Sequence, residues 1–288
     1  MKKLRDCKVL VVGLGQIGGS LAYELKSRRL VGEVIGFDKD RSTLAHAQKK
    51  AVVGRTVGNL KEGLGEADIV VLAMPIRAIV ATLPTVARFM KKGSVCLDVA
   101  GTTSEILATA AWLSPSINYV SGHPITGTEK HGIESARLGL FAGKTFVLTP
   151  SPHFKRDARA SITQLVQKLG ARPVVIPAER HDRLIAQTSH LPYCLALALS
   201  RQVGLTARTD PALWKLVGGS LRSGTRVANS SPDLTVDMLS TNRRQVIQAI
   251  DKYVKALEDL KQTIETKSDP GLRRYAVKAR KIAGRIAK

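Results

Sequence analysis

The sequence has few cysteines, few aromatic residues and no long apolar run. Three of its 288 residues are cysteine, and Cys7, Cys96 and Cys194 lie far apart in apolar segments. This spacing excludes a disulfide framework or a zinc site and favours free thiols in a reducing compartment. No apolar run approaches the roughly 20 residues that a membrane-spanning helix needs. Because the basic N-terminus lacks a cleavage site of small residues, we expect no signal peptide, and we predict a cytoplasmic protein that does not contact membranes.

Acidic residues are also scarce relative to basic ones. The chain holds 45 Lys and Arg against 23 Asp and Glu, a net charge of +22. A positive field of this size attracts anions of every kind, from nucleic acid to small carboxylates. Nucleic-acid binding is therefore a competing interpretation. The low aromatic content of 4% and the lack of a recognisable nucleic-acid-binding motif count against it.

Up to residue 177, short apolar segments alternate with amphipathic helical patterns. Helices are predicted at 16–29 and 42–50. The predicted strands are 8–12, 33–37, 68–74, 94–99, 118–121, 145–148 and 172–176. Strands that alternate with helices are typical of right-handed crossovers between parallel strands. We therefore predict an α/β protein with a Rossmann-type, doubly wound parallel sheet.

The pattern changes after Pro177. Apolar residues then recur at helical spacing, as in Leu195, Leu199 and Val203, and no convincing strand is found. The sequence thus predicts two domains. Residues 1–178 are expected to bind a dinucleotide, and residues 179–288 to form an all-helical domain.

A glycine-rich turn follows the first predicted strand. Residues 13–18 read Gly-Leu-Gly-Gln-Ile-Gly and fit G-x-G-x-x-G at the start of a helix, and Asp38 ends the second predicted strand, 20 residues beyond Gly18. The glycines allow a tight turn and a close approach of a pyrophosphate, while the aspartate accepts hydrogen bonds from ribose hydroxyls. This pattern predicts NAD as cofactor, and the neighbouring Lys39 and Arg41 keep NADP possible. The predicted cofactor-binding residues are Gly13, Gly15, Gln16, Ile17, Gly18 and Asp38.

A histidine follows the strand predicted at 118–121. His123 lies between Gly122 and Pro124, where ligands of doubly wound sheets bind, outside the carboxyl ends of the strands. An imidazole at this place can take a hydroxyl proton while a hydride leaves the same carbon. A loop histidine with only a structural hydrogen bond is the alternative. No metal site is predicted.

Four ordered segments resemble the prephenate/arogenate dehydrogenase family of tyrosine biosynthesis. The first, Gly-His-Pro-Ile-Thr-Gly-Thr-Glu-Lys-His-Gly at 122–132, is similar to the family's G-H-P-[MI]-x-G-T-E-K-x-G, and Phe-Ala-Gly-Lys at 141–144 continues it. The second is His181-Asp182. The third, Ser-His-Leu-Pro-Tyr at 189–193, is similar to S-H-L-P-H. The fourth, at 218–228, is similar to G-G-x-F-[RK]-D-x-T-R-[IV]-A.

This resemblance implies NAD(P)-dependent oxidative decarboxylation of a cyclohexadienyl acid. His123 falls on the family's catalytic histidine, and Arg226 on the arginine that binds a substrate carboxylate. The leading interpretation is conversion of prephenate to 4-hydroxyphenylpyruvate. The alternatives are conversion of arogenate to tyrosine and, in another class, a non-catalytic dinucleotide-binding protein associated with nucleic acid. The resemblance also implies a homodimer through the helical domain.

The sequence departs from the family pattern near the expected substrate. Tyr193 replaces a histidine, so that positive charge near neutral pH is lost there. In the segment similar to D-x-G-S-x-K, Thr102 takes the place of the serine in one alignment and Gly101 does so in the other. We predict that Thr102 is a catalytic residue whose hydroxyl serves the nicotinamide or His123. The predicted substrate-binding residues are Arg226, His190, Tyr193 and Gly219.

Overall fold

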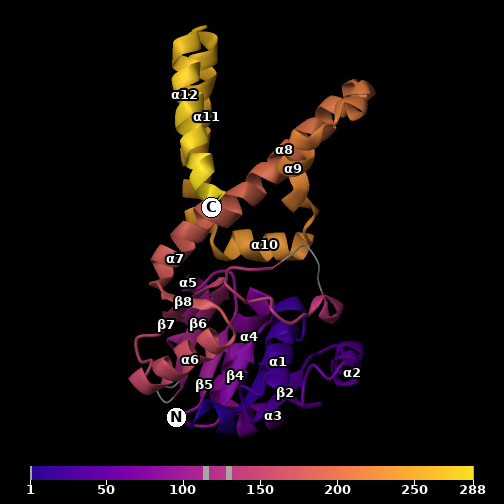
Figure 1. Ribbon diagram of the computed structural model, residues 1–288, viewed down its shortest axis with the longest axis vertical. Coiled ribbons are helices and arrows are strands. Elements are labelled where there is room, and N and C mark those ends of the chain that lie inside the picture. The colour runs from indigo at the N-terminus through magenta and orange to yellow at the C-terminus, as the bar shows by residue number, and fades with distance from the viewer. Residues whose placement is uncertain (1, 113–116, 128–131, 288) are drawn as a thin grey trace. The chain divides into compact units, whose positions relative to one another are not determined.

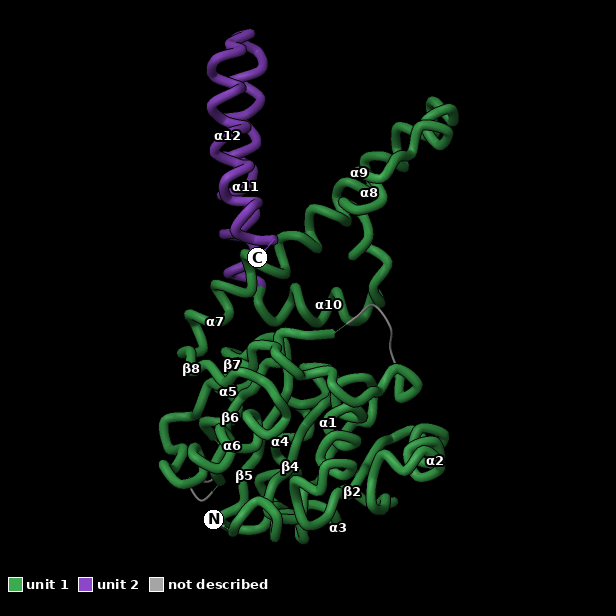
Figure 2. Tube along the Cα trace, in the orientation of Figure 1, with its two compact units in different colours: residues 1–242 green, residues 243–288 purple. Residues whose placement is uncertain are grey.

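The computed structural model describes residues 2–112, 117–127 and 132–287. By internal contacts the chain divides into two compact units, residues 1–242 and 243–288 (Figure 2). None of the described helices is long and apolar enough to cross a membrane.

The described part of the first unit contains an eight-stranded sheet with the strand order β3-β2-β1-β4-β5-β6-β7-β8 (Figure 1). The strands are β1 (Lys8–Val12), β2 (Glu33–Phe37), β3 (Arg55–Thr56), β4 (Ile69–Leu72), β5 (Val95–Asp98), β6 (Asn118–Pro124), β7 (Thr145–Pro150) and β8 (Arg172–Val175). The order reverses direction next to β1, as in two mononucleotide-binding halves joined side by side. This confirms the predicted Rossmann-type fold class.

Two details of the sheet differ from the prediction. Strand β7 pairs antiparallel with β6, and β8 then runs parallel to β7. An antiparallel neighbour needs no crossover helix, and the described residues between β6 and β7 contain only one short 3₁₀ turn, Ile133–Ser135. The second difference is β3, whose two residues are too short to show a periodic pattern.

Helices cover both faces of the sheet. They are α1 (Gln16–Ser27), α2 (Arg41–Lys49), α3 (Leu60–Glu66), α4 (Ile76–Phe89), α5 (Ser104–Ala110) and α6 (Arg156–Lys168). Side chains of α1, α2 and α6 join Val9 and Val11 in one apolar core, and those of α3, α4 and α5 join Leu10 and Val12 in the other. This alternation along β1 is the two-residue period of a strand buried on both faces.

The described residues after β8 are helical or in loops, as the prediction of an all-helical part requires. In the first unit they form α7 (Ala178–Ile185), a π-helical turn (Ala186–His190), α8 (Leu191–Thr209), α9 (Gly219–Thr225) and α10 (Pro232–Thr241), with 3₁₀ turns at Pro211–Leu216 and Arg226–Asn229. The second unit consists of α11 (Arg243–Glu265) and α12 (Asp269–Ile286), which contact each other. The predicted domain boundary at 178/179 differs from the division into compact units and stays a prediction.

A buried carboxylate ties the ends of β5 and β6 together. Asp98 accepts hydrogen bonds from the hydroxyls of Tyr119 at 2.9 Å and Ser121 at 3.0 Å, and from the backbone N–H of Ala100 at 3.0 Å. Burial raises the pKa of Asp98 to about 7, although these hydrogen bonds act in the opposite direction. The contacts fix the loop after β5 beside the end of β6, where His123 lies.

Gly122 gives a test of this arrangement. A Cβ at Gly122 would lie 2.8 Å from Leu97 Cδ1, 2.8 Å from Phe146 Cε1 and 3.0 Å from the backbone oxygen of Asp98. Gly122→Ala should therefore overpack the sheet and lower the free energy of unfolding by about 1–3 kcal/mol. The measurement is urea unfolding followed by circular dichroism.

Gly65→Ala is the matched control for this variant. Gly65 lies in α3, and a Cβ there would meet only the Phe89 backbone oxygen, at 4.0 Å. Because alanine favours a helix by about 0.5–1 kcal/mol over glycine, this variant should be as stable as the parent or slightly more so. Equal unfolding midpoints for the two variants would show that a side chain at position 122 does not destabilise the sheet, which would contradict the prediction.

Candidate active site

The glycine-rich turn has the geometry of a phosphate-binding turn. Gly13 has a φ of +90°, and a Cβ on it would collide with the backbone oxygen of Ala73. A Cβ on Gly18 would collide with the backbone oxygen of Gly13, whereas a Cβ on Gly15 would meet nothing within 4 Å. The first and third glycines thus serve close packing, and the second leaves open space at the N-terminus of α1, where orphan N–H groups favour phosphate.

Asp38 lies directly after β2, beside this turn. Its Oδ2 accepts a hydrogen bond from Leu14 N at 2.8 Å, and its Oδ1 accepts one from Asp40 N at 3.0 Å. These bonds orient the carboxylate and leave each oxygen a further lone pair for a ribose hydroxyl. The residues present therefore fit a dinucleotide. Ile17 packs against the apolar core, and its place among the cofactor-binding residues stays a prediction.

The histidine segment lies next to the glycine-rich turn. A Cβ on Gly127 would lie 3.8 Å from Oε1 of Gln16. The segment that follows β6 and the N-terminus of α1 are therefore neighbours, as a site for a dinucleotide and a proton acceptor requires. Residues 128–131, which belong to the same motif, lie outside the described residues.

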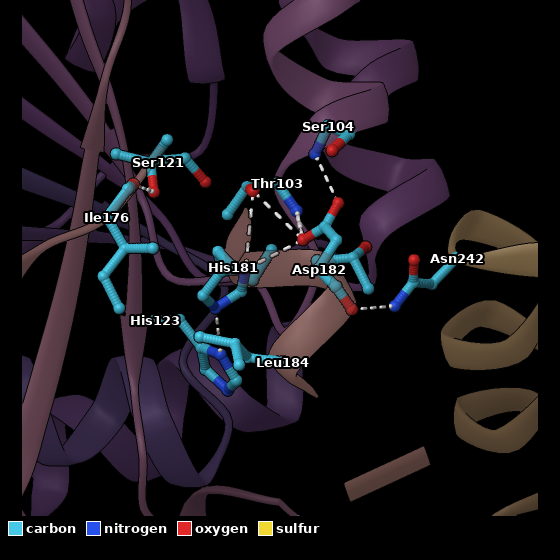
Figure 3. A network of polar contacts seen from close by, with 12 residues as sticks. Thr103, Ser104, Ser121, His123, Ile176, His181, Asp182, Leu184 and Asn242 are labelled. Atoms are coloured by element: carbon cyan, nitrogen blue, oxygen red, sulfur yellow. Dashed lines mark hydrogen bonds and ion pairs between the residues drawn. The ribbon is translucent and has the colours of Figure 1, made fainter. Parts of the chain in front are cut away.

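His123 is joined to a second histidine and an aspartate on α7 (Figure 3). Its Nδ1 lies 3.0 Å from Nε2 of His181, and the two rings meet edge to face with centroids 5.2 Å apart. Nδ1 of His181 lies 2.8 Å from Oδ1 of Asp182. His181 and Asp182 are each 1% exposed. The three side chains form a continuous hydrogen-bonded row from the partly buried His123 on β6 to the buried pair on α7, called the relay below.

Asp182 also receives the first backbone N–H groups of α5. Thr103 N donates to Oδ1 at 2.9 Å, Ser104 N donates to Oδ2 at 2.8 Å, and the Thr103 hydroxyl donates to Oδ1 at 3.1 Å. Burial alone raises the pKa of Asp182, but the hydrogen bonds from His181, Ser104 and Thr103 outweigh it and lower the pKa below its usual value. Asp182 is therefore an ionised acceptor in a buried place.

His123 is held neutral by its surroundings. Burial, and after it the neighbouring His181 and His190, lower the pKa of His123 to about 3, against a smaller raising effect of Asp182. A neutral imidazole has one nitrogen with a lone pair, and only in this form can it accept a proton.

The predicted contact between the Thr102 hydroxyl and His123 is not found in the structure. Thr102 is 1% exposed, and its hydroxyl pairs with that of Thr241 in α10 at 2.9 Å. The residue near the imidazole is Gly101, where a Cβ would lie 4.0 Å from Nε2 of His123. The alignment that places Gly101 at the family's serine therefore agrees with the geometry, and the one that places Thr102 there does not.

Two predicted substrate-binding residues lie on the helices after the relay. His190, at the end of the π-helical turn, is 1% exposed, and its Nδ1 lies 3.2 Å from the amide nitrogen of Asn242. This amide also donates to the backbone oxygen of Asp182, at 2.8 Å, and so links His190 to the relay. Burial lowers the pKa of His190 to about 4. Tyr193, on α8, pairs its hydroxyl with that of Ser230 at 3.0 Å.

The other two lie on exposed segments. Gly219 is the first residue of α9, and a Cβ on it would meet nothing within 4 Å. Arg226 is exposed and begins the 3₁₀ turn that contacts α8, the helix of Tyr193. Their place in the site of His123 stays a prediction. No group of three or more metal-ligating side chains occurs among the described residues.

The sequence did not predict that His181 and Asp182 contact His123 in a row. The pair stands out as one of the segments that resemble the family, but neighbours in sequence cannot show a partner 58 residues away. Their position in the sequence was a usable signal: both residues lie in α7, the helix that directly follows β8, and so begin near an end of the sheet.

The fold and this site define a dinucleotide-dependent dehydrogenase. Residues 21–175 match the family model described as "Prephenate dehydrogenase, nucleotide-binding domain", and residues 177–278 match "Prephenate dehydrogenase, dimerization domain". The chain therefore belongs to the prephenate dehydrogenase family. These matches confirm the predicted family and the predicted class of enzyme.

Individual relatives agree with this assignment. A prephenate dehydrogenase of Lactococcus lactis is 30% identical over 96% of this chain and 76% of the relative. A cyclohexadienyl dehydrogenase of Zymomonas mobilis is 29% identical over 89% of this chain and 88% of the relative.

Solved structures agree as well. The prephenate dehydrogenase of A. aeolicus in complex with hydroxyphenyl propionate and NAD+ has a TM-score of 0.92 and 25% identity over 99% of this chain and 100% of that chain. The arogenate dehydrogenase of Synechocystis has a TM-score of 0.84 and 28% identity over 97% of this chain and 99% of that chain.

Asp38 should decide the choice between NAD and NADP. Its carboxylate would bind the ribose hydroxyls and repel a 2′-phosphate. Asp38→Ser should lower the ratio of kcat/KM for NAD over NADP by about 10–100-fold, the worth of a hydrogen bond to a charged group. The measurement is the initial rate with each cofactor.

Asp40→Asn is the control for this variant. Asp40 accepts hydrogen bonds from Ser42 and Thr43 at the start of α2 and bears a similar charge two residues away. The control should leave the cofactor ratio unchanged. An unchanged ratio in Asp38→Ser would mean that Asp38 does not contact the ribose.

Proposed function

We propose that this enzyme converts prephenate to 4-hydroxyphenylpyruvate with NAD as cofactor, a step of tyrosine biosynthesis. The observation that carries the proposal is a neutral His123 in the segment that lies next to the glycine-rich turn, in a chain that matches both models of the prephenate dehydrogenase family. NAD is the cofactor because Asp38 stands where the ribose hydroxyls bind and because the related A. aeolicus enzyme binds NAD+.

His123 performs the proton transfer of this reaction. When bound, NAD supplies the acceptor for the hydride that leaves the ring carbon bearing the hydroxyl. Nε2 of His123 accepts the hydroxyl proton as the carbon becomes a carbonyl. The ring carboxylate then leaves as CO₂, and its bonding electrons make the ring aromatic. The phenolate oxygen takes up a proton, which returns His123 to its neutral form.

Arg226, His190, Tyr193 and Gly219 are the proposed substrate-binding residues. A guanidinium matches a carboxylate with two parallel hydrogen bonds, which suits Arg226 to a carboxylate of the substrate. Tyr193 offers a hydroxyl where the family has a histidine, and this hydroxyl pairs with that of Ser230, so that either can donate.

Arogenate is the second candidate substrate. It differs from prephenate in bearing an amino group in place of the side-chain keto group, and a solved relative from Synechocystis is an arogenate dehydrogenase. The replacement of a histidine by the uncharged Tyr193 favours a substrate whose side chain is itself less negative. The test is to offer prephenate and arogenate separately, each with NAD and with NADP, and to follow the reduced cofactor. Absence of turnover in all four combinations would overturn the proposed function.

The proposed compartment is the cytoplasm. Cys7, Cys96 and Cys194 are free thiols, and the first two are buried. Proteins of oxidising compartments more often pair their cysteines in disulfides.

The proposed assembly is a homodimer through the helical part. The family model that matches residues 177–278 is described as a dimerization domain. In the second unit, Val254 and Leu257 of α11 are 45% and 53% exposed, and Ile247 and Ile264 are 52% and 56% exposed. Such a row of exposed apolar side chains on one helix favours an interface.

Charges in this row should dissociate the dimer. We expect one dimeric species for the parent chain in sedimentation velocity at micromolar concentration. The double variant Val254→Glu/Leu257→Glu should shift it to the monomer, because an interface core rejects unpaired charges. Lys255→Glu, an exposed charge change on the same helix, should leave the dimer intact. A monomeric parent chain would contradict the proposed assembly.

Substitutions at His123 and Arg226 should have different kinetic effects. His123→Asn can hydrogen-bond the hydroxyl but cannot take its proton, so kcat should fall on the order of 10²–10⁴-fold with KM little changed. Arg226→Ala removes an ion pair that exists before the transition state, so KM should rise strongly and kcat should fall less. The measurement is steady-state kinetics with the preferred substrate.

NAD binding is the control for both variants. Neither residue belongs to the glycine-rich turn, so the dissociation constant for NAD, measured by fluorescence titration, should match that of the parent. If His123→Asn kept near-normal kcat, another group would have to act as the base.

A further inference from the structure

We propose that His181 and Asp182 are positioning residues that place the proton of neutral His123 on Nδ1 and so leave Nε2 as the proton acceptor. The inference rests on the proposed role of His123 as the base. It assigns a task to two residues that do not themselves reach the substrate.

Asp182 decides which nitrogen donates in each hydrogen bond of the relay, because it can only accept. Asp182 is ionised and can only accept hydrogen bonds, and two backbone N–H groups and the Thr103 hydroxyl already point at it. Nδ1 of His181, 2.8 Å from Oδ1, must therefore carry a hydrogen and donate it. A carboxylate that fixes the tautomer of a neighbouring imidazole in this way is a general device of catalytic sites.

The hydrogen bond between His181 and His123 then decides which nitrogen of His123 carries its hydrogen. A neutral His181 with its hydrogen on Nδ1 has a lone pair on Nε2. Nδ1 of His123, 3.0 Å from that nitrogen, must then be the donor. In this arrangement the lone pair of His123 is on Nε2. A cationic His181 would reverse the second bond, place a hydrogen on Nε2 of His123 and abolish the base, so the two arrangements make opposite predictions.

The surroundings of Nε2 suit this role. The nearest atom to a Cβ added on Gly101 would be Nε2 of His123, at 4.0 Å, so a side chain at position 101 would contact this nitrogen, and glycine leaves that side of it without one. His181, by contrast, is 1% exposed and has both ring nitrogens engaged. His181 thus acts through His123 and has no nitrogen available to a substrate.

The relay also supports the charge that forms on His123 during the reaction. His123 becomes a cation in the buried row when it takes up the substrate proton, and the negative charge of Asp182 raises its pKa against the effect of burial. Removing that charge weakens the base and lets both tautomers form. The structure therefore gives Asp182 an effect on kcat that does not require contact with the substrate.

The direct test is the tautomer of His123, read from nitrogen-15 spectra of protein labelled at histidine. We expect a protonated Nδ1 and a bare Nε2 in the parent chain. Nε2 should stay bare down to about pH 5, because burial lowers the pKa of His123 to about 3. In Asp182→Asn both tautomers should appear. A hydrogen on Nε2 in the parent chain at neutral pH would overturn the proposal.

Kinetics give a second, independent readout. Asp182→Asn should lower kcat on the order of 10²–10⁴-fold, with KM and the NAD dissociation constant within about twofold of the parent. His181→Leu should lower kcat similarly, and His181→Gln, whose amide can both donate and accept, should restore part of it. Asp237→Asn is the control, because Asp237 is a buried carboxylate that pairs with Arg77 outside the relay.

The outcomes separate this proposal from the proposed function. If His123→Asn loses activity while Asp182→Asn keeps the parent kcat, the function stands and the relay is wrong. If the parent chain turns over neither substrate, the function is wrong, and the spectra still decide the tautomer. A loss of kcat in Asp182→Asn together with a large loss of NAD affinity or of thermal stability would show a structural role only, and would also overturn the proposal.

Discussion

An ionised carboxylate without contact to water is the constraint on which this site depends. Asp182 can remain charged inside the protein only while several donors surround it, since an unpaired buried charge costs far more than one hydrogen bond returns. Those donors come from different parts of the chain: the first residues of α5, and the histidine beside it on α7. Satisfying this one group fixes α7 against the carboxyl edge of the sheet, and thereby fixes the ring that orients His123.

The same edge of the sheet is shaped by residues that have small side chains or none. Gly13 and Gly18 let α1 pack against the strand ends, and Gly122 lets β6 pass between Leu97 and Phe146. At Gly101, the lack of a side chain leaves space next to Nε2 of His123. The polar groups Asp38, Asp98 and Asp182 each hold a loop through backbone N–H groups. Small residues thus provide the space, and carboxylates provide the orientation.

Much of this could be predicted from the sequence because the signals are local. Strands buried on both faces appear as apolar runs, and the turn at 13–18 has its glycines and its helix within a few residues. The direction of β7 could not be predicted in this way, because an apolar run pairs equally well in either direction. The relay joins residues 58 positions apart, and its partners at 103 and 104 lie 78 or more positions from Asp182. Only the folded chain shows such pairs.

The partner of the Thr102 hydroxyl could not be predicted for the same reason. Its hydroxyl is chemically suited to a histidine, and one alignment favours it, but in the folded chain it pairs with the hydroxyl of Thr241 in α10. The backbone dihedral angles decide which of two neighbouring residues, Gly101 or Thr102, faces His123. The sequence does not reveal these angles, whereas the structure shows position 101 next to Nε2 of His123.

The place of α7 in the chain order has a consequence for how the catalyst is built. The glycine-rich turn, Asp38 and His123 are complete once the sheet has formed, but the two residues that orient His123 follow the last strand. Without α7, the ring of His123 would lose its hydrogen bond to His181. Cofactor recognition and the orientation of His123 therefore depend on different parts of the chain, and the second needs the contacts that α7 makes.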